Sequence, residues 1–158
     1  MRMRYSIIAA LALSLAAPPA HAGTGFSAHL DGFQEPALIC PSGPSSGTGL
    51  GYFVLDDFHH LSCSTTYSGL LGTPSLSHIH KGAIGVAGGV VLGFSSPISP
   101  IIQVFTLTAA QEADLNAGLY YINVHSSFCP SGEIRGQILP DPTPTHGASW
   151  GRLKILYR

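Results

Sequence analysis

The stretch "YINVHSSFCPSGEIRGQI", residues 121–138, predicts two antiparallel strands and the turn between them. In its first part Tyr121, Asn123 and His125 alternate with two aliphatic residues, so the polar side chains would share one face of a strand. A loop rich in Ser, Pro and Gly follows, and the alternation resumes from Glu133. One face is therefore apolar and the other polar, as in an antiparallel sheet that covers a core.

The same two-residue period extends over most of the chain, from Phe26 to Leu139, with Gly, Pro, Ser and Asp between the runs. One segment, "TAAQEADLNAG" at residues 108–118, begins with a capping threonine and ends at glycine, which predicts a short helix. We therefore expect an all-β fold, an antiparallel Greek-key sandwich or barrel of about eight strands with one short helical turn. The expected strands cover residues 26–32, 48–56, 61–69, 75–81, 89–94, 101–107, 119–125 and 133–139.

The N-terminus has the pattern of a secretory signal peptide. Two arginines precede an apolar run that is too short to span a bilayer, and small residues surround a cleavage position near Ala22. We therefore expect a signal peptide over residues 1–22, one domain over 23–139, and a Pro-rich linker with a disordered basic tail over 140–158. Such a protein would be secreted or periplasmic.

The charge of the mature chain limits the classes of partner. Without the two arginines of the signal peptide, five basic residues remain against eight acidic ones, and three of the five lie in the last seven positions. Such a surface offers no clustered Lys and Arg for nucleic acid. No second apolar segment is long enough to span a membrane. We expect a monomer with an unknown extracellular or cell-envelope ligand.

The chain has three cysteines, so at least one is unpaired within it. Cys63 lies on the less polar face of an expected strand, where a cysteine is most often a small buried hydrophobe. Cys40 and Cys129 both lie in loops rich in Pro, Ser and Gly. Because disulfides persist in exported proteins, we predict a bridge between Cys40 and Cys129.

The stretch "HIHKGAIGVAGGVV", residues 78–91, adds two histidines to His125. His78 and His80 share one face of a strand, and an adjacent strand could bring His125 to them. Three imidazoles suit zinc or copper. The alternative is a hydrogen-bonded network that only braces the fold, in which Arg135 bonds Glu133 or backbone carbonyls.

The predicted hairpin would turn Glu133 and Arg135 onto the side of these histidines, so we expect both residues beside the histidine patch. Catalytic motifs in their required structural setting are absent: the chain has no G-x-S-x-G elbow between a strand and a helix, no H-E-x-x-H, no P-loop and no G-x-G-x-x-G that opens a helix. The sequence therefore favours a binding or structural role over an enzyme.

Three motifs in order, "LDGFQEP", "HIHKGAIGVAGGVV" and "LYYINVHSSFCPSGEIRGQI", resemble the CHRD domain, which is repeated in chordin and occurs singly in many exported bacterial proteins. The likeness covers about residues 26–139. It implies an all-β domain of extracellular setting, and we predict that this domain acts as a non-catalytic binding or structural module. It does not carry over growth-factor antagonism, which is credited chiefly to chordin's cysteine-rich modules. The motif residues that we expect to form a polar network are Glu35, Asn123, Glu133 and Arg135.

A fainter similarity is to Cu/Zn superoxide dismutases, which bind copper through an H-x-H pair and a later histidine. This likeness implies copper-ligand roles for His78, His80 and His125 and an anion-guiding role for Arg135. Residues 82–121 contain no histidine to bind zinc, so full dismutase activity is not implied. The alternative function is a copper-binding redox protein with a degenerate three-histidine site.

Overall fold

The computed structural model describes residues 23–36, residue 40 and residues 43–141 of the chain. The predicted signal peptide and the tail beyond Asp141 lie outside the described residues. Within the described part, no helix has the length and apolar character needed to cross a membrane.

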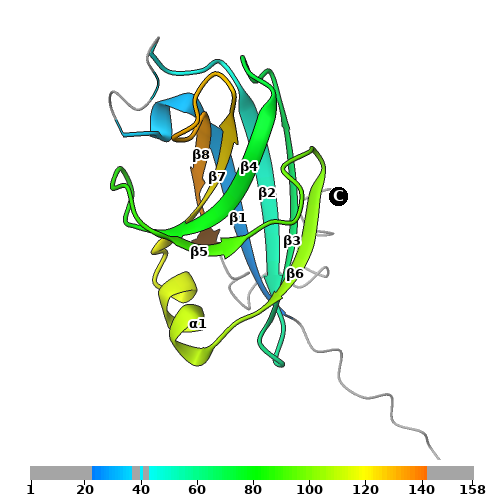
Figure 1. The fold of residues 1–158 in the computed structure, drawn as a ribbon. Helices are drawn as coiled ribbons and strands as arrows, with labels where there is room; N and C mark the ends of the chain where they lie inside the picture. Colours follow the sequence, from blue (N-terminus) through cyan, green and yellow to red (C-terminus); the bar gives the residue numbers. More distant parts are fainter. Residues whose placement is uncertain (1–22, 37–39, 41–42, 142–158) are drawn as a thin grey trace, which may run out of the picture.

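Strands make up about half of the described chain, which also has one α-helix and one 3₁₀ turn (Figure 1). The strand and helix bounds confirm the expected all-β class and the short helix after residue 107. In chain order the elements are β1 (Thr24–Asp31), η1 (Gly32–Gln34), β2 (Thr48–Leu55), β3 (His60–Ser68), β4 (Pro74–Lys81), β5 (Val90–Gly93), β6 (Ile101–Thr106), α1 (Ala109–Asn116), β7 (Tyr120–Ser126), β8 (Ile134–Gln137) and β9 (Leu139–Pro140).

All strand pairs are antiparallel and form one sheet in the order β5-β4-β7-β8-β1-β2-β3-β6, with β9 paired to β1. The sheet curls so that its two edge strands approach each other (Figure 1). Gln103 of β6 donates a hydrogen bond to the carbonyl of Gly93 at the end of β5 (3.3 Å). The expected sandwich or barrel is therefore a nearly closed barrel.

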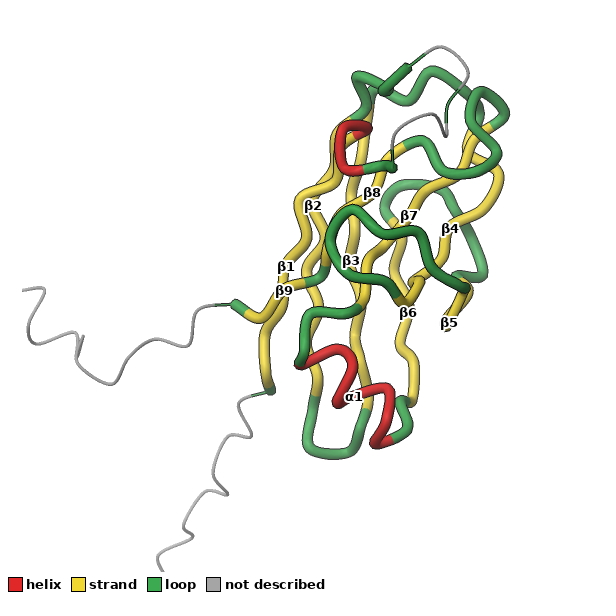
Figure 2. Tube along the Cα trace, turned by 90° about the vertical axis from the view of Figure 1, so that its left-hand side faces the viewer, coloured by secondary structure: helices red, strands yellow, loops and turns green. Residues whose placement is uncertain are grey.

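The barrel interior holds the side chains from alternate strand positions, as the two-residue period predicts. Each large aliphatic or aromatic residue that is fully removed from water contributes about 1.5–3 kcal/mol. Helix α1 lies at one end of the barrel (Figure 2), where its Leu115 is fully buried. The fully buried core residues of the strands include Phe26, Leu30, Leu61, Ile79, Ile122, Val124 and Ile134.

The last expected strand, 133–139, divides into β8 and β9. Strand β8 pairs with β7 and, through Arg135, with Asp31 of β1, whereas Leu139 and Pro140 pair with Ser27 and Phe26 of β1. Pairing with β7 stops because β7 begins at Tyr120, and Pro140 has no N–H to donate to a second ladder.

The turn η1 has no counterpart among the elements predicted from the sequence. The carboxylate of Asp31 accepts hydrogen bonds from the backbone N–H groups of Phe33 (2.8 Å) and Gln34 (3.0 Å), which caps this turn. A turn capped in this way directs the following residues, including Glu35, back over the outer face of β8, where the backbone N–H of Gln137 donates to the Gln34 side chain (3.3 Å).

The predicted disulfide is confirmed: Cys40 and Cys129 are bonded, with their Cα atoms 5.2 Å apart. Cys63 is free and buried in the core, and its burial raises the pKa of the thiol to about 12. A thiol with such a pKa stays protonated and is a poor nucleophile or metal ligand.

Candidate metal centre

The pairing of β4 with β7 brings the predicted site residues onto neighbouring positions of one sheet face. His78 lies opposite Asn123, and His80 lies opposite Tyr121. His125 is two residues beyond Asn123 and therefore projects to the same side. Core residues occupy the alternate positions of both strands, so this face is the outer face of the barrel.

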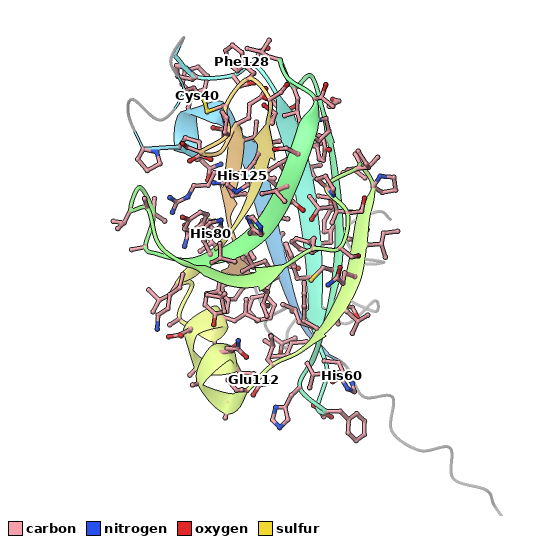
Figure 3. All side chains as sticks on the ribbon, viewed as in Figure 1. Cys40, His60, His80, Glu112, His125 and Phe128 are labelled. Carbon is pink, nitrogen blue, oxygen red and sulfur yellow. A yellow bond between two sulfur atoms is a disulfide. The ribbon has the colours of Figure 1, made fainter. Side chains whose placement is uncertain are left out.

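The three histidines converge into what we call the three-histidine centre (His78, His80 and His125). One ring nitrogen from each lies within 4.8 Å of those of the other two. His78 Nδ1 and His125 Nε2 are 3.1 Å apart. Figure 3 shows the labelled His80 and His125 side chains on the same region of the barrel wall. Three nitrogens at this spacing can reach one ion.

Backbone carbonyls fix the protonation of two rings. His80 Nδ1 lies 2.9 Å from the carbonyl of Gly88, and His125 Nδ1 lies 2.9 Å from the carbonyl of Pro130. A carbonyl only accepts, so each Nδ1 carries the hydrogen and each Nε2 presents a lone pair. His80 Nε2 is buried without a hydrogen-bond partner among the described residues. Histidines that bind a metal are oriented in the same way, because the ring nitrogen that does not bind the metal donates a hydrogen bond to a neighbouring acceptor.

Burial lowers the pKa of all three histidines, and their mutual repulsion adds to the effect at His78 and His125. At His80 the charge of Arg135 lowers the pKa further. The rings are therefore neutral near pH 7, as metal ligation requires. The pKa values of these histidines are higher in the unfolded chain, so the unfolded chain binds protons at a higher pH than the folded protein does. The folded state therefore loses stability as the pH falls below about 6.5.

A stack of three planar groups supports His80. Its ring lies parallel to that of Tyr121, with centroids 5.0 Å apart and an interplanar angle of 11°. On Tyr121 lies the guanidinium of Arg135, whose central carbon is 3.4 Å from the ring centroid. Arg135 is buried and donates to the carbonyls of Ala83 and Val86, both at 2.9 Å. The 82–89 loop is thereby held over the stack.

Glu35 and Asn123 extend this polar surface next to Arg135. Burial raises the pKa of Glu35 to about 7, although the charge of Arg135 and the side chain of Asn123 oppose the shift. Glu35 Oε1 and Asn123 Oδ1 are buried without hydrogen-bond partners among the described residues. The carboxylate near Arg135 is therefore that of Glu35.

The structure gives Glu133 different partners from those we expected. Its carboxylate accepts hydrogen bonds from the hydroxyls of Ser45 and Ser126 and from backbone N–H groups of the segment after β3. No bond to Arg135 or to a histidine occurs among its described contacts. Glu133 precedes β8, where the alternation of the strand does not yet fix the direction of a side chain.

Some of the groups that shape the centre were not predicted in their roles. Strand alternation places Tyr121 and Gln137 on the polar face, but it does not predict that both contact Arg135. The carbonyls of Gly88 and Pro130 give no such signal, because every residue has a carbonyl and only the folded loops select these two.

Gly88 is expected to tolerate no side chain. A Cβ at this position would lie 1.6 Å from the carbonyl oxygen of Lys81, whereas a Cβ on Gly89 would meet nothing within 4 Å. Gly88→Ala should therefore destabilise the domain by about 2 kcal/mol or more through overpacking, and Gly89→Ala should have little effect. Thermal unfolding followed by circular dichroism tests this. Equal melting temperatures would contradict the described path of the 82–89 loop.

Comparison with known proteins identifies one family. The CHRD domain model matches residues 26–138, which includes all three motifs quoted above. Among curated proteins and among solved structures, no significant match to the chain was found.

Proposed function

Because this chain belongs to the CHRD domain family, we propose that it acts as an exported, non-catalytic binding module, and that it binds a copper ion at the three-histidine centre. The family supports a binding or structural role. Family membership and the Cys40–Cys129 disulfide are both consistent with an extracellular or cell-envelope protein. Removal of residues 1–22 as a signal peptide is part of the proposal.

The buried, unpartnered Nε2 of His80 is the observation that carries the metal proposal. A buried acceptor without a partner costs about 1–3 kcal/mol. A histidine network that only braced the fold would be expected to satisfy this atom. A metal ion would satisfy it, because two further imidazole nitrogens lie within 4.8 Å.

Copper is favoured over zinc by general affinity. Imidazole nitrogens suit both metals, and a given set of such ligands binds Cu²⁺ more tightly than Zn²⁺. The group of possible metal ligands found among the described residues consists of these three histidines, with no carboxylate or thiolate. The donor set therefore consists of neutral nitrogens.

A copper-binding redox protein is the second candidate function. Three protein ligands leave at least one coordination position open, which is a property of catalytic rather than purely structural metal sites. If a bound copper ion were redox-active, copper-loaded protein in air-saturated buffer should oxidise ascorbate catalytically, with dioxygen as the oxidant that returns Cu⁺ to Cu²⁺. A rate equal to that of the apo protein would exclude this candidate while leaving copper binding untouched.

Metal titration of protein purified without a histidine tag tests the proposed function. We expect one copper ion per chain, held against a competing chelator more tightly than zinc. Protein that retains no copper above the buffer blank would contradict the proposal. His78→Ala then distinguishes the bracing alternative, which predicts a lower melting temperature and no change in metal content.

A further inference from the structure

The disulfide joins the loop whose carbonyl contacts His125 to Cys40, which follows the segment of Glu35. Cys129 is fully buried in the loop of residues 127–133, directly before Pro130, whose carbonyl holds His125. Cys40 follows the segment that carries Glu35. In Figure 3 the labelled Cys40 lies on the His125 side of the barrel, far from His60 at the opposite end.

Contacts between these segments are close. Gly132 has φ +134°, and a Cβ at this position would lie 2.4 Å from Asn123 Nδ2 and 2.6 Å from Glu35 Oε1. The 127–133 loop therefore lies directly against Asn123 and Glu35. The Cys40–Cys129 disulfide adds a covalent link between the two segments, at residues that are 89 apart in sequence.

The remaining contacts of the loop hold its start and its end. The hydroxyl of Ser126 accepts from the backbone N–H groups of Phe128 and Cys129, both at 3.1 Å, and Gly132 N–H donates to the carbonyl of Cys129 (3.1 Å). For Pro130, which has no N–H, the bond that its carbonyl accepts from His125 is the described hydrogen bond. Its position therefore depends on the anchored neighbour, Cys129.

We propose that the Cys40–Cys129 disulfide is a positioning element of the metal centre: it keeps the Pro130 carbonyl on His125 Nδ1, and thereby keeps the lone pair of His125 Nε2 available to the metal. This inference rests on the proposed metal-binding function. Without the bond, the loop samples arrangements in which the carbonyl is displaced. The apparent affinity then falls in proportion to the fraction of molecules that retain the binding arrangement.

The double variant Cys40→Ser/Cys129→Ser tests the proposal. Loss of an outer partner of a metal-ligating histidine lowers metal affinity about 10–100-fold, and we expect a loss in this range for Zn²⁺ and Cu²⁺. Zinc is included because it has no redox chemistry with residual thiol. Cys63→Ser controls for the loss of a cysteine as such, and Leu115→Ala, in α1, controls for a general loss of stability.

A spectroscopic readout separates positioning from stability. In the folded apo protein, imidazole ¹⁵N shifts should show His125 as the Nδ1–H tautomer, and the double variant should show a mixture of tautomers while the backbone spectrum stays folded. The proposal is overturned if the double variant keeps both the tautomer and the wild-type affinity, or if Leu115→Ala weakens binding equally. If the wild-type protein binds no metal, the proposed function fails first and this inference fails with it.

Discussion

Replacement of Glu133 by alanine is expected to lower the free energy of unfolding by about 3–5 kcal/mol, because several buried donors would lose their acceptor at about 1–3 kcal/mol each. Glu133 is completely inaccessible to solvent. Its carboxylate accepts from the hydroxyls of Ser45 (2.6 Å) and Ser126 and from the N–H groups of Leu71 (2.5 Å) and Gly72 (3.3 Å). The substitution would strand these donors and separate the loops that they belong to.

Glu112→Ala is the matched control for this substitution. Glu112 forms an ion pair with His59 (3.0 Å) at the surface, where such pairs contribute about 0–1 kcal/mol. Urea denaturation of both variants gives the comparison. A loss below about 1 kcal/mol for Glu133→Ala would contradict the structural role assigned to this carboxylate.

Acid denaturation gives an independent test of Glu133. Burial alone would raise its pKa, but the hydrogen bonds from Ser126, Ser45 and the two backbone N–H groups outweigh that effect and lower it. The stabilisation is therefore complete above the ordinary glutamate pKa near 4.5 and is lost as the pH falls through the lower folded value. The wild-type protein should lose stability in this range more steeply than Glu133→Ala.

His80→Ala is expected to lower copper affinity by more than about 100-fold, because loss of a ligand should exceed the 10–100-fold cost of losing an outer partner. The stability of the apo protein should change little, since the substitution also removes a buried nitrogen that has no partner.

His60→Ala is the control for His80→Ala. His60 lies at the opposite end of the barrel (Figure 3) and pairs with Asp56 at the surface (3.1 Å). This variant should keep wild-type copper affinity. If His80→Ala lowers the melting temperature substantially and leaves copper binding unchanged, the bracing alternative is correct.

Much of the centre could be predicted from strand parity. The spacing of His78 and His80, together with the alternation through His125, was enough to place three imidazoles on one face. The register of β4 against β7 then brings them within reach of one another. The disulfide followed from two cysteines in polar loops. These predictions succeed because a strand fixes the direction of each side chain.

The failures occur where no regular strand constrains the chain. Glu133 lies in a loop, so its partners depend on how Ser45 and the segment after β3 fold around it. The carbonyls of Gly88 and Pro130 act through backbone atoms that carry no residue-specific pattern. The division of the last strand into β8 and β9 follows from where β7 begins, which is a property of the assembled sheet rather than of the local sequence.

Anomalous diffraction from crystals of the copper-loaded protein, measured at the copper edge, tests the central claim most directly. We predict one anomalous peak about 2 Å from His78 Nδ1, His80 Nε2 and His125 Nε2. A copper ion bound elsewhere, for example at His59 and His60 on the opposite end of the barrel, or no peak at all in crystals grown with excess copper, would contradict the account.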